Sequence, residues 1–293
     1  MIAVYILITL LMLTLLVTVH EFGHFIMAKK CGVTVLEFSI GMGPALYSKQ
    51  GEETLFSIRA FPIGGYCRML GEQEDDESPE ADDSAPEPES ACPVPDDLKE
   101  QQASGSDVAD DAVSGIVQNE ADPGDFRNKS KAQRFAILAA GPVMNFVLGF
   151  ILLLICYFCL GASVSQAFTA GGQAFVAYST AVFDSLRMLF TGEVGINDLA
   201  GPVGMVSMVQ EVYSYGFVML ISFSAFLSIN LGVMNLLPIP ALDGGQMFII
   251  AAEAVCRHDL SEKIKGYLIA ASFVFLIGLM VLVAVNDVLR ITG

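Results

Sequence analysis

Three residues near the N-terminus, His20, Glu21 and His24, have the types and spacing that bind a metal ion and activate water. They form the pattern H-E-x-x-H in the stretch His-Glu-Phe-Gly-His. Two histidines four positions apart lie on one face of a helix, and the glutamate between them can reach a water at the metal. This pattern predicts His20 and His24 as zinc ligands and Glu21 as the catalytic carboxylate.

A hydrolytic zinc site uses three protein ligands and one open position. The chain has only three histidines, so the third ligand is either His258 or a carboxylate. His258 lies in the polar stretch Cys-Arg-His-Asp, which is typical of a surface loop. Asp243 is the better candidate, because two prolines break the helix before it and two glycines follow it. Irregular backbone at membrane depth is tolerated mainly where it lines a cavity, so we expect Asp243 to complete the site.

This set of residues would hydrolyse a peptide bond. Bound zinc would polarise the scissile carbonyl and lower the pKa of its water to about 7. Glu21 would take the proton from that water as a general base and later deliver it to the leaving amine. Neighbouring amide donors would hold the tetrahedral oxyanion.

The elements that position these residues are long apolar segments. Of the 293 residues, 54% are hydrophobic, and the mean hydropathy is +0.59, which is more apolar than an ordinary soluble domain. Four stretches reach the roughly 20 residues that a helix needs to cross a bilayer. Ionisable groups inside the first stretch are costly there, which favours a functional role for them. We expect a mainly α-helical polytopic membrane protein, with spans at 1–28, 135–160, 216–237 and 264–285.

Charge is distributed unevenly along the chain. The net charge is −17, and residues 72–125 alone hold 19 acidic residues and one basic residue. Such a segment repels nucleic acid and cannot bury enough apolar surface to fold, so we expect a disordered acidic insert there. Ten of the 15 Lys and Arg residues lie between Lys29 and Arg134. The positive-inside rule therefore places this connection in the cytosol and both termini outside.

Shorter elements lie between the spans. Residues 33–38 and 54–58 roughly alternate apolar and polar positions on either side of a likely turn at Gly51. This pattern predicts a small membrane-associated β-hairpin within 29–71, closed by the Pro-Ile-Gly-Gly segment from Pro62. The edge of such a sheet could accept an extended peptide as an added strand. Residues 175–189 predict an amphipathic helix that either lies along the membrane surface or dips into it. The remaining transmembrane core, 126–293, carries the Leu-Asp-Gly motif.

The two chemical motifs together resemble the site-2 protease family of intramembrane zinc metalloproteases, in its bacterial RseP-type branch. One motif is His-Glu-Phe-Gly-His at the end of a first span, and the other is Asn-Leu-Leu-Pro-Ile-Pro-Ala-Leu-Asp-Gly-Gly after a later span. The resemblance covers nearly the whole chain apart from the acidic insert. Further matching stretches are Gly41–Pro44 followed by Phe61–Tyr66, Ala140–Asn145, and Leu199–Gly204.

The resemblance implies a zinc endopeptidase that cleaves within the membrane. Its Zn²⁺ ligands would be His20, His24 and Asp243, and its catalytic carboxylate would be Glu21. Its substrates would be single-span membrane proteins, such as anti-sigma factors or signal-peptide remnants. The resemblance also implies a multi-pass protein of the bacterial cytoplasmic (inner) membrane, whose partners are substrate and lipid bilayer and not nucleic acid. Two side chains, Asn230 and Asn235, would hydrogen-bond the substrate backbone, although polar amides also join helices in membranes.

One departure from that branch concerns substrate access. RseP-type proteases usually carry one or two PDZ domains between the second and third spans. The connection of residues 161–212 is too short to hold one, which puts PDZ-dependent gating in doubt. The oligomeric state stays open.

Two other functions compete with proteolysis. A catalytically silent relative, acting as a membrane chaperone or binding protein, would keep the fold but would not need an intact Glu21 and three ligands. An ion-coupled transporter would show inverted repeats with broken helices in matching halves. The chain has a single broken segment, near Pro238 and Pro240, and no self-similarity. A Glu21→Gln variant discriminates the silent relative from the protease.

Overall fold

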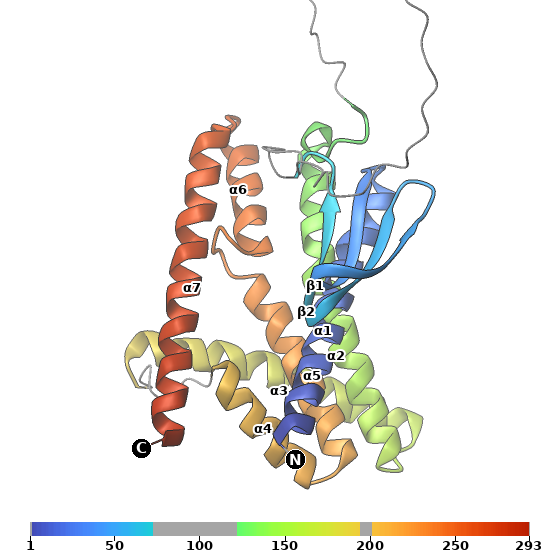
Figure 1. The fold of residues 1–293 in the computed structure, drawn as a ribbon, viewed down its shortest axis with the longest axis vertical. Helices are drawn as coiled ribbons and strands as arrows, with labels where there is room; N and C mark the ends of the chain where they lie inside the picture. The colour runs from blue at the N-terminus through green and yellow to red at the C-terminus, as the bar shows by residue number, and fades with distance from the viewer. Residues whose placement is uncertain (1, 73–121, 194–200, 293) are drawn as a thin grey trace, which may run out of the picture. The chain divides into compact units, whose positions relative to one another are not determined.

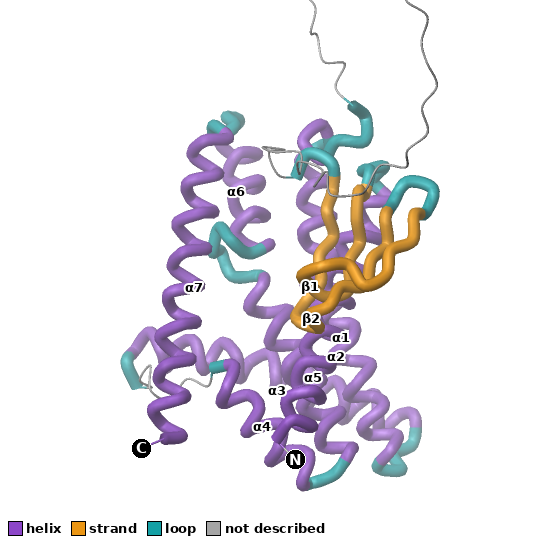
Figure 2. The backbone as a smooth tube through the Cα atoms, in the orientation of Figure 1, coloured by secondary structure: helices purple, strands orange, loops and turns teal. Residues whose placement is uncertain are grey.

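The computed structural model describes residues 2–72, 122–193 and 201–292, and within these ranges the chain is mainly helical (Figures 1 and 2). The acidic insert, residues 72–125, which we expect to be disordered, lies almost wholly outside the described ranges. The elements, in chain order, are α1 (Ile2–Lys30), β1 (Val35–Gln50), β2 (Leu55–Met69), a 3₁₀ turn (Phe126–Asn128), α2 (Lys131–Cys159), α3 (Val164–Thr191), α4 (Pro202–Ser214), α5 (Phe217–Asn235), α6 (Asp243–Cys256) and α7 (Glu262–Thr292).

Four of these helices are long and apolar enough to cross a membrane, which confirms the predicted fold class. They are α1, α2, α5 and most of α7, and their ends lie within a few residues of the predicted spans. Sequence signals set some of these ends. Ser130 and Gln133 form a capping box at the start of α2, and two prolines follow the turn that ends α5.

The predicted hairpin is present, and its strands are longer than the sequence pattern indicated. The two strands pair antiparallel, with Val35 opposite Met69 and Gln50 opposite Leu55. Pro62 lies inside β2 and does not close the unit, which corrects the expectation. Proline is tolerated there because that stretch of β2 pairs with β1 on one side only among the described residues, so the missing N–H can face away from β1.

An apolar core joins the hairpin to the helices. Ala28 of α1, Val35 of β1, Ile137 of α2 and Ile250 of α6 are buried in one cluster, together with side chains of β2. The chain that returns from the acidic insert is attached to the same core, because Thr34 donates a backbone hydrogen bond of 2.9 Å to Gly124. The last residues of the predicted insert are therefore part of the folded unit.

Helices α1, α2 and α5 pack through small residues. A methyl carbon added at Gly23 would lie 2.3 Å from the Ala140 carbonyl oxygen, and one at Gly149 would lie 2.6 Å from Ile229. Close backbone approach of this kind is how helices associate in lipid, where apolar burial gives little driving force. The packing brings α2 against both α1 and α5.

The described part of the connection between α2 and α5 is mainly helical. Helix α3 is longer than the predicted amphipathic stretch, since it begins at Val164 behind a capping box of Ser163 and Gln166. In Figure 1 it runs crosswise to α7. Helix α4 follows and ends at Ser214, shortly before α5.

Candidate metal centre

The C-terminal half of α1 places two imidazoles next to each other. Because His20 and His24 are four residues apart on one helix, both rings point to the same side of α1, and their Nε2 atoms are 3.2 Å apart. Both residues are buried, with 6% of their surface exposed. The predicted histidine pair is therefore brought together in a solvent-poor part of the chain.

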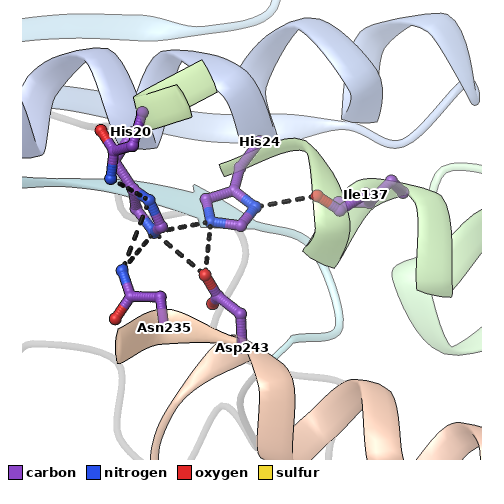
Figure 3. Close-up of polar contacts among 6 residues, drawn as sticks. His20, His24, Ile137, Asn235 and Asp243 are labelled. Carbon is purple, nitrogen blue, oxygen red and sulfur yellow. Dashed lines mark hydrogen bonds and ion pairs between the residues drawn. The ribbon is translucent and has the colours of Figure 1, made fainter. Parts of the chain in front are cut away.

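The third candidate, Asp243, comes from the opposite side, at the start of α6 (Figure 3). Its Oδ2 atom lies 3.0 Å from Nε2 of His20 and 3.4 Å from Nε2 of His24. The turn that carries it folds back tightly on α5. A methyl carbon at Gly244 would lie 2.3 Å from the backbone of Leu236, and only glycine permits this approach. The motif thus brings the carboxylate to the two rings.

These three atoms fit a zinc ion. Zinc binds imidazole nitrogen and carboxylate oxygen at about 2.0–2.2 Å with tetrahedral geometry, which requires ligand atoms roughly 3.3 Å apart. The three separations above, 3.0, 3.2 and 3.4 Å, match that spacing. Within the described residues, this is the one group of three or more His, Cys, Asp or Glu side chains that could hold a metal ion. The alternative ligand, His258, is exposed between α6 and α7.

The charge state of the carboxylate suits a ligand. Burial alone would raise the pKa of Asp243, but hydrogen bonds and charge from His20 and His24 outweigh it and lower the pKa to about 2. Asp243 is therefore ionised at neutral pH, as a zinc ligand must be.

Glu21 lies beside this centre, on the face of α1 that meets the hairpin. Its side chain is half-buried and lies near Cys67 of β2. The hairpin therefore lies beside the glutamate. A charged group held next to the open side of a metal site can act as a general base.

Helix α2 contacts both imidazoles, which the sequence motifs had not indicated. The Ile137 carbonyl oxygen is 2.9 Å from Nδ1 of His24, and the Asn145 amide nitrogen is 3.1 Å from Nδ1 of His20. A methyl carbon at Gly141 would lie 2.3 Å from Nε2 of His24. The stretch Ala-Gly-Pro-Val-Met-Asn was recognised only as a family resemblance. A buried Asn in an apolar span was the signal that could have indicated its role.

The two asparagines expected to bind substrate lie at the end of α5. The amide nitrogen of Asn235 lies 3.4 Å from Nδ1 and 3.3 Å from Nε2 of His20, so it is at the centre (Figure 3). Asn230 is half-buried five residues earlier in the same helix, and no hydrogen bond of its side chain is found among the described residues. Asn235 is thus close to the reacting site, and Asn230 has no such contact.

Comparison with known proteins agrees with this geometry. The profile of Peptidase family M50 matches residues 8–279. The zinc metalloprotease RasP of Shouchella clausii is 25% identical, over 95% of this chain and 97% of that protein. A protein assigned as a zinc metalloprotease in Clostridium perfringens is 30% identical over 97% of this chain and 98% of its own, and one in Clostridium acetobutylicum is 26% identical over 97% of both. The chain is a zinc metalloprotease of peptidase family M50, the site-2 protease family.

Proposed function

We propose that this metalloprotease cleaves its substrates within the membrane, with His20, His24 and Asp243 as zinc ligands and Glu21 as general base. The observation that carries the proposal is the convergence of three donor atoms within 3.4 Å of one another near one end of a membrane-spanning helix. Bound zinc would supply a Lewis acid for the scissile carbonyl and for the attacking water.

The protein's own contribution to the reaction is the proton transfer. Glu21 accepts the proton of the attacking water and then delivers it to the nitrogen of the leaving amine, so that no proton is lost to solvent. Burial of the neighbouring imidazoles excludes competing water, which strengthens each of these polar interactions.

The hairpin is suited to present an extended peptide to Glu21. The edge of β2 that is not paired with β1 points toward α1, where the Thr14 hydroxyl donates to the Pro62 carbonyl and Cys67 lies near Glu21. A substrate that adds to this edge would pass the catalytic carboxylate. An extended conformation is also required chemically, because a helix hides its scissile carbonyl.

We assign the substrates to single-span membrane proteins, such as anti-sigma factors or signal-peptide remnants, in the bacterial cytoplasmic membrane. The charge pattern supports a position of the centre near the cytosolic side, since Lys29 and Lys30 end the helix that carries it. Asn235 and Asn230 would hold the substrate backbone by their amide groups. The proximity of Asn235 to His20 supports this role for the former.

Substrate selection would differ from that of longer relatives. The alignment with the Clostridium acetobutylicum protein spans 372 positions, so that protein carries segments without a counterpart in these 293 residues. Helices α3 and α4 occupy most of the connection between α2 and α5. We therefore propose that access to the site does not depend on a PDZ domain.

The test is cleavage of a panel of transmembrane peptides by the purified protein, with products identified by mass. We expect cleavage that a zinc chelator abolishes and added zinc restores. A Glu21→Gln variant should bind one zinc ion with unchanged helix content and lose cleavage, because the amide cannot accept the proton. Unchanged turnover in this variant would refute the mechanism. Zinc binding without cleavage in the native chain would favour a silent chaperone or binding relative.

A further inference from the structure

The two imidazoles of the metal centre have different partners on their outer nitrogens. Both rings direct Nε2 toward Asp243, so Nε2 is the atom of each ring that would bind zinc. A ring whose Nε2 binds a metal carries its proton on Nδ1, which then needs an acceptor. For His24 that acceptor is the Ile137 carbonyl oxygen at 2.9 Å, since a carbonyl can only accept.

For His20 the position next to Nδ1 is occupied by Asn145. Its amide nitrogen lies 3.1 Å from Nδ1, and its amide oxygen is buried without a hydrogen-bond partner. In this orientation the amide donates to the ring, so the proton of His20 sits on Nε2 and blocks the metal position. Rotation of the amide by 180° exchanges its oxygen and nitrogen at nearly the same places.

We propose that Asn145 is a positioning residue of the metal centre, whose amide oxygen accepts the Nδ1 proton of His20 when zinc is bound. The exchange leaves the Nε2 lone pair of His20 free for the metal. This inference rests on the proposed zinc site. It assigns to α2 the task of setting the tautomer of both histidine ligands.

The surroundings of Asn145 support a fixed role. The residue is fully buried in a membrane-spanning helix, where an amide without a function is costly. Its backbone carbonyl accepts a 2.8 Å hydrogen bond from Ser228 of α5, which is also fully buried. The backbone that carries the amide is therefore held by a contact between α2 and α5.

Asn235 is not placed to do the same. Its amide nitrogen is almost equally far from both ring nitrogens of His20, at 3.4 and 3.3 Å. The two nitrogen lone pairs point in different directions, so an atom equidistant from both is aligned with neither. Asn235 thus serves as a matched control from the same centre.

The experiment measures zinc affinity by competition with a chromophoric chelator in detergent-solubilised full-length protein. The variants are Asn145→Leu, which has a similar volume and no hydrogen bond, and Asn145→Asp, which keeps an acceptor. We expect Asn145→Leu to bind zinc about 10- to 100-fold more weakly, which is the usual effect of removing a hydrogen-bond partner of a metal-bound histidine. Asn145→Asp should bind zinc with near-native affinity. Asn235→Ala should keep native zinc affinity and reduce cleavage.

A second readout separates this role from general destabilisation. In long-range ¹H–¹⁵N spectra of zinc-loaded protein with labelled histidine, the Nδ1–H proton of His20 should show the downfield shift of a hydrogen-bonded proton in the native protein and in Asn145→Asp, and should lose that shift in Asn145→Leu. Native zinc affinity in Asn145→Leu would overturn the inference, as would an Asn145→Asp variant as weak as Asn145→Leu. His24→Ala provides the reference. If His24→Ala retains zinc, the proposed zinc site itself is wrong. If His24→Ala loses zinc but Asn145→Leu binds zinc as tightly as the native protein, only the role of Asn145 is refuted.

Discussion

Substituting alanine for Gly141 is the most direct test of how α2 meets the metal centre. The added methyl carbon would lie 2.3 Å from Nε2 and 2.6 Å from Cε1 of His24, and 2.7 Å from Cε1 of His20. Ordinary contacts begin near 3.4 Å, so the His24 ring must move by about 1 Å. Neither ring is flexible enough to avoid this, because each is buried and held at Nδ1 by α2.

A displacement of this size should disable the site while the bundle stays folded. Zinc–nitrogen bonds of about 2.0–2.1 Å cannot absorb a 1 Å shift, so zinc affinity should fall at least about 10-fold. A misplacement of about 1 Å can also cost roughly 100-fold in rate, and we expect cleavage to fall by that factor even at saturating zinc. Chelator competition gives the affinity, and peptide cleavage followed by mass gives the rate.

The matched control is Gly278→Ala in α7. Gly278 is also a glycine inside a membrane-spanning helix, but nothing lies within 4 Å of an added methyl carbon there. Replacing a helical glycine by alanine stabilises a helix by about 0.5–1 kcal/mol, so this variant should keep its activity and its stability. A Gly141→Ala protein with native zinc affinity would show that α2 does not lie against the imidazoles as described.

Two further predictions concern the parts that frame the centre. Burial alone would raise the pKa of Glu37, but hydrogen bonds from Ser57, Tyr66 and Arg59 outweigh it and lower the pKa. Because the folded-state pKa is lowered, the stability that Glu37 gives the hairpin is present at neutral pH. It is lost as the pH falls through the lowered pKa. The protection of β1 and β2 amides from hydrogen exchange, taken relative to the intrinsic rate at each pH, should therefore fall at acid pH in the native protein. A Glu37→Gln variant with the same pH response would contradict this. Lys265→Met should lower the free energy of unfolding by about 3 kcal/mol, because it leaves the buried Glu253 without the cation 2.9 Å away. The double variant Lys265→Met with Glu253→Leu should recover most of that loss in denaturant unfolding.

The sequence was sufficient to predict the spans and the pairing of His20 with His24, because both depend on local patterns. A membrane span needs only length and apolar composition, and H-E-x-x-H specifies its own geometry once the helix forms. The approach of Asp243 to the two histidines was predictable for a different reason. Its prolines and glycines are costly inside a helix at membrane depth, so they indicate a turn that serves a purpose.

The contribution of α2 was not predictable, because it depends on which helix packs against α1 and in which register. Nothing in the sequence near Asn145 says that its amide meets His20, more than a hundred residues away. The length of the β-strands was misjudged for a related reason. Pro62 suggests an end to the hairpin from its local chemistry, but this part of β2 pairs on one side only and tolerates it.

The packing of the helices and the metal centre are consequences of the same small residues. Gly23 lets α1 approach the backbone of α2 at Ala140, and the next residue along each helix at that crossing is His24 on one side and Gly141 on the other. The crossing that joins the helices therefore also sets the distance between the imidazoles and their partners on α2. A change that separates α1 from α2 weakens the contacts of α2 with the Nδ1 atoms of His20 and His24 directly, whereas it affects Asp243 of α6 only indirectly. Packing defects far from Glu21 should for this reason appear first as weaker zinc binding and only then as loss of folded protein.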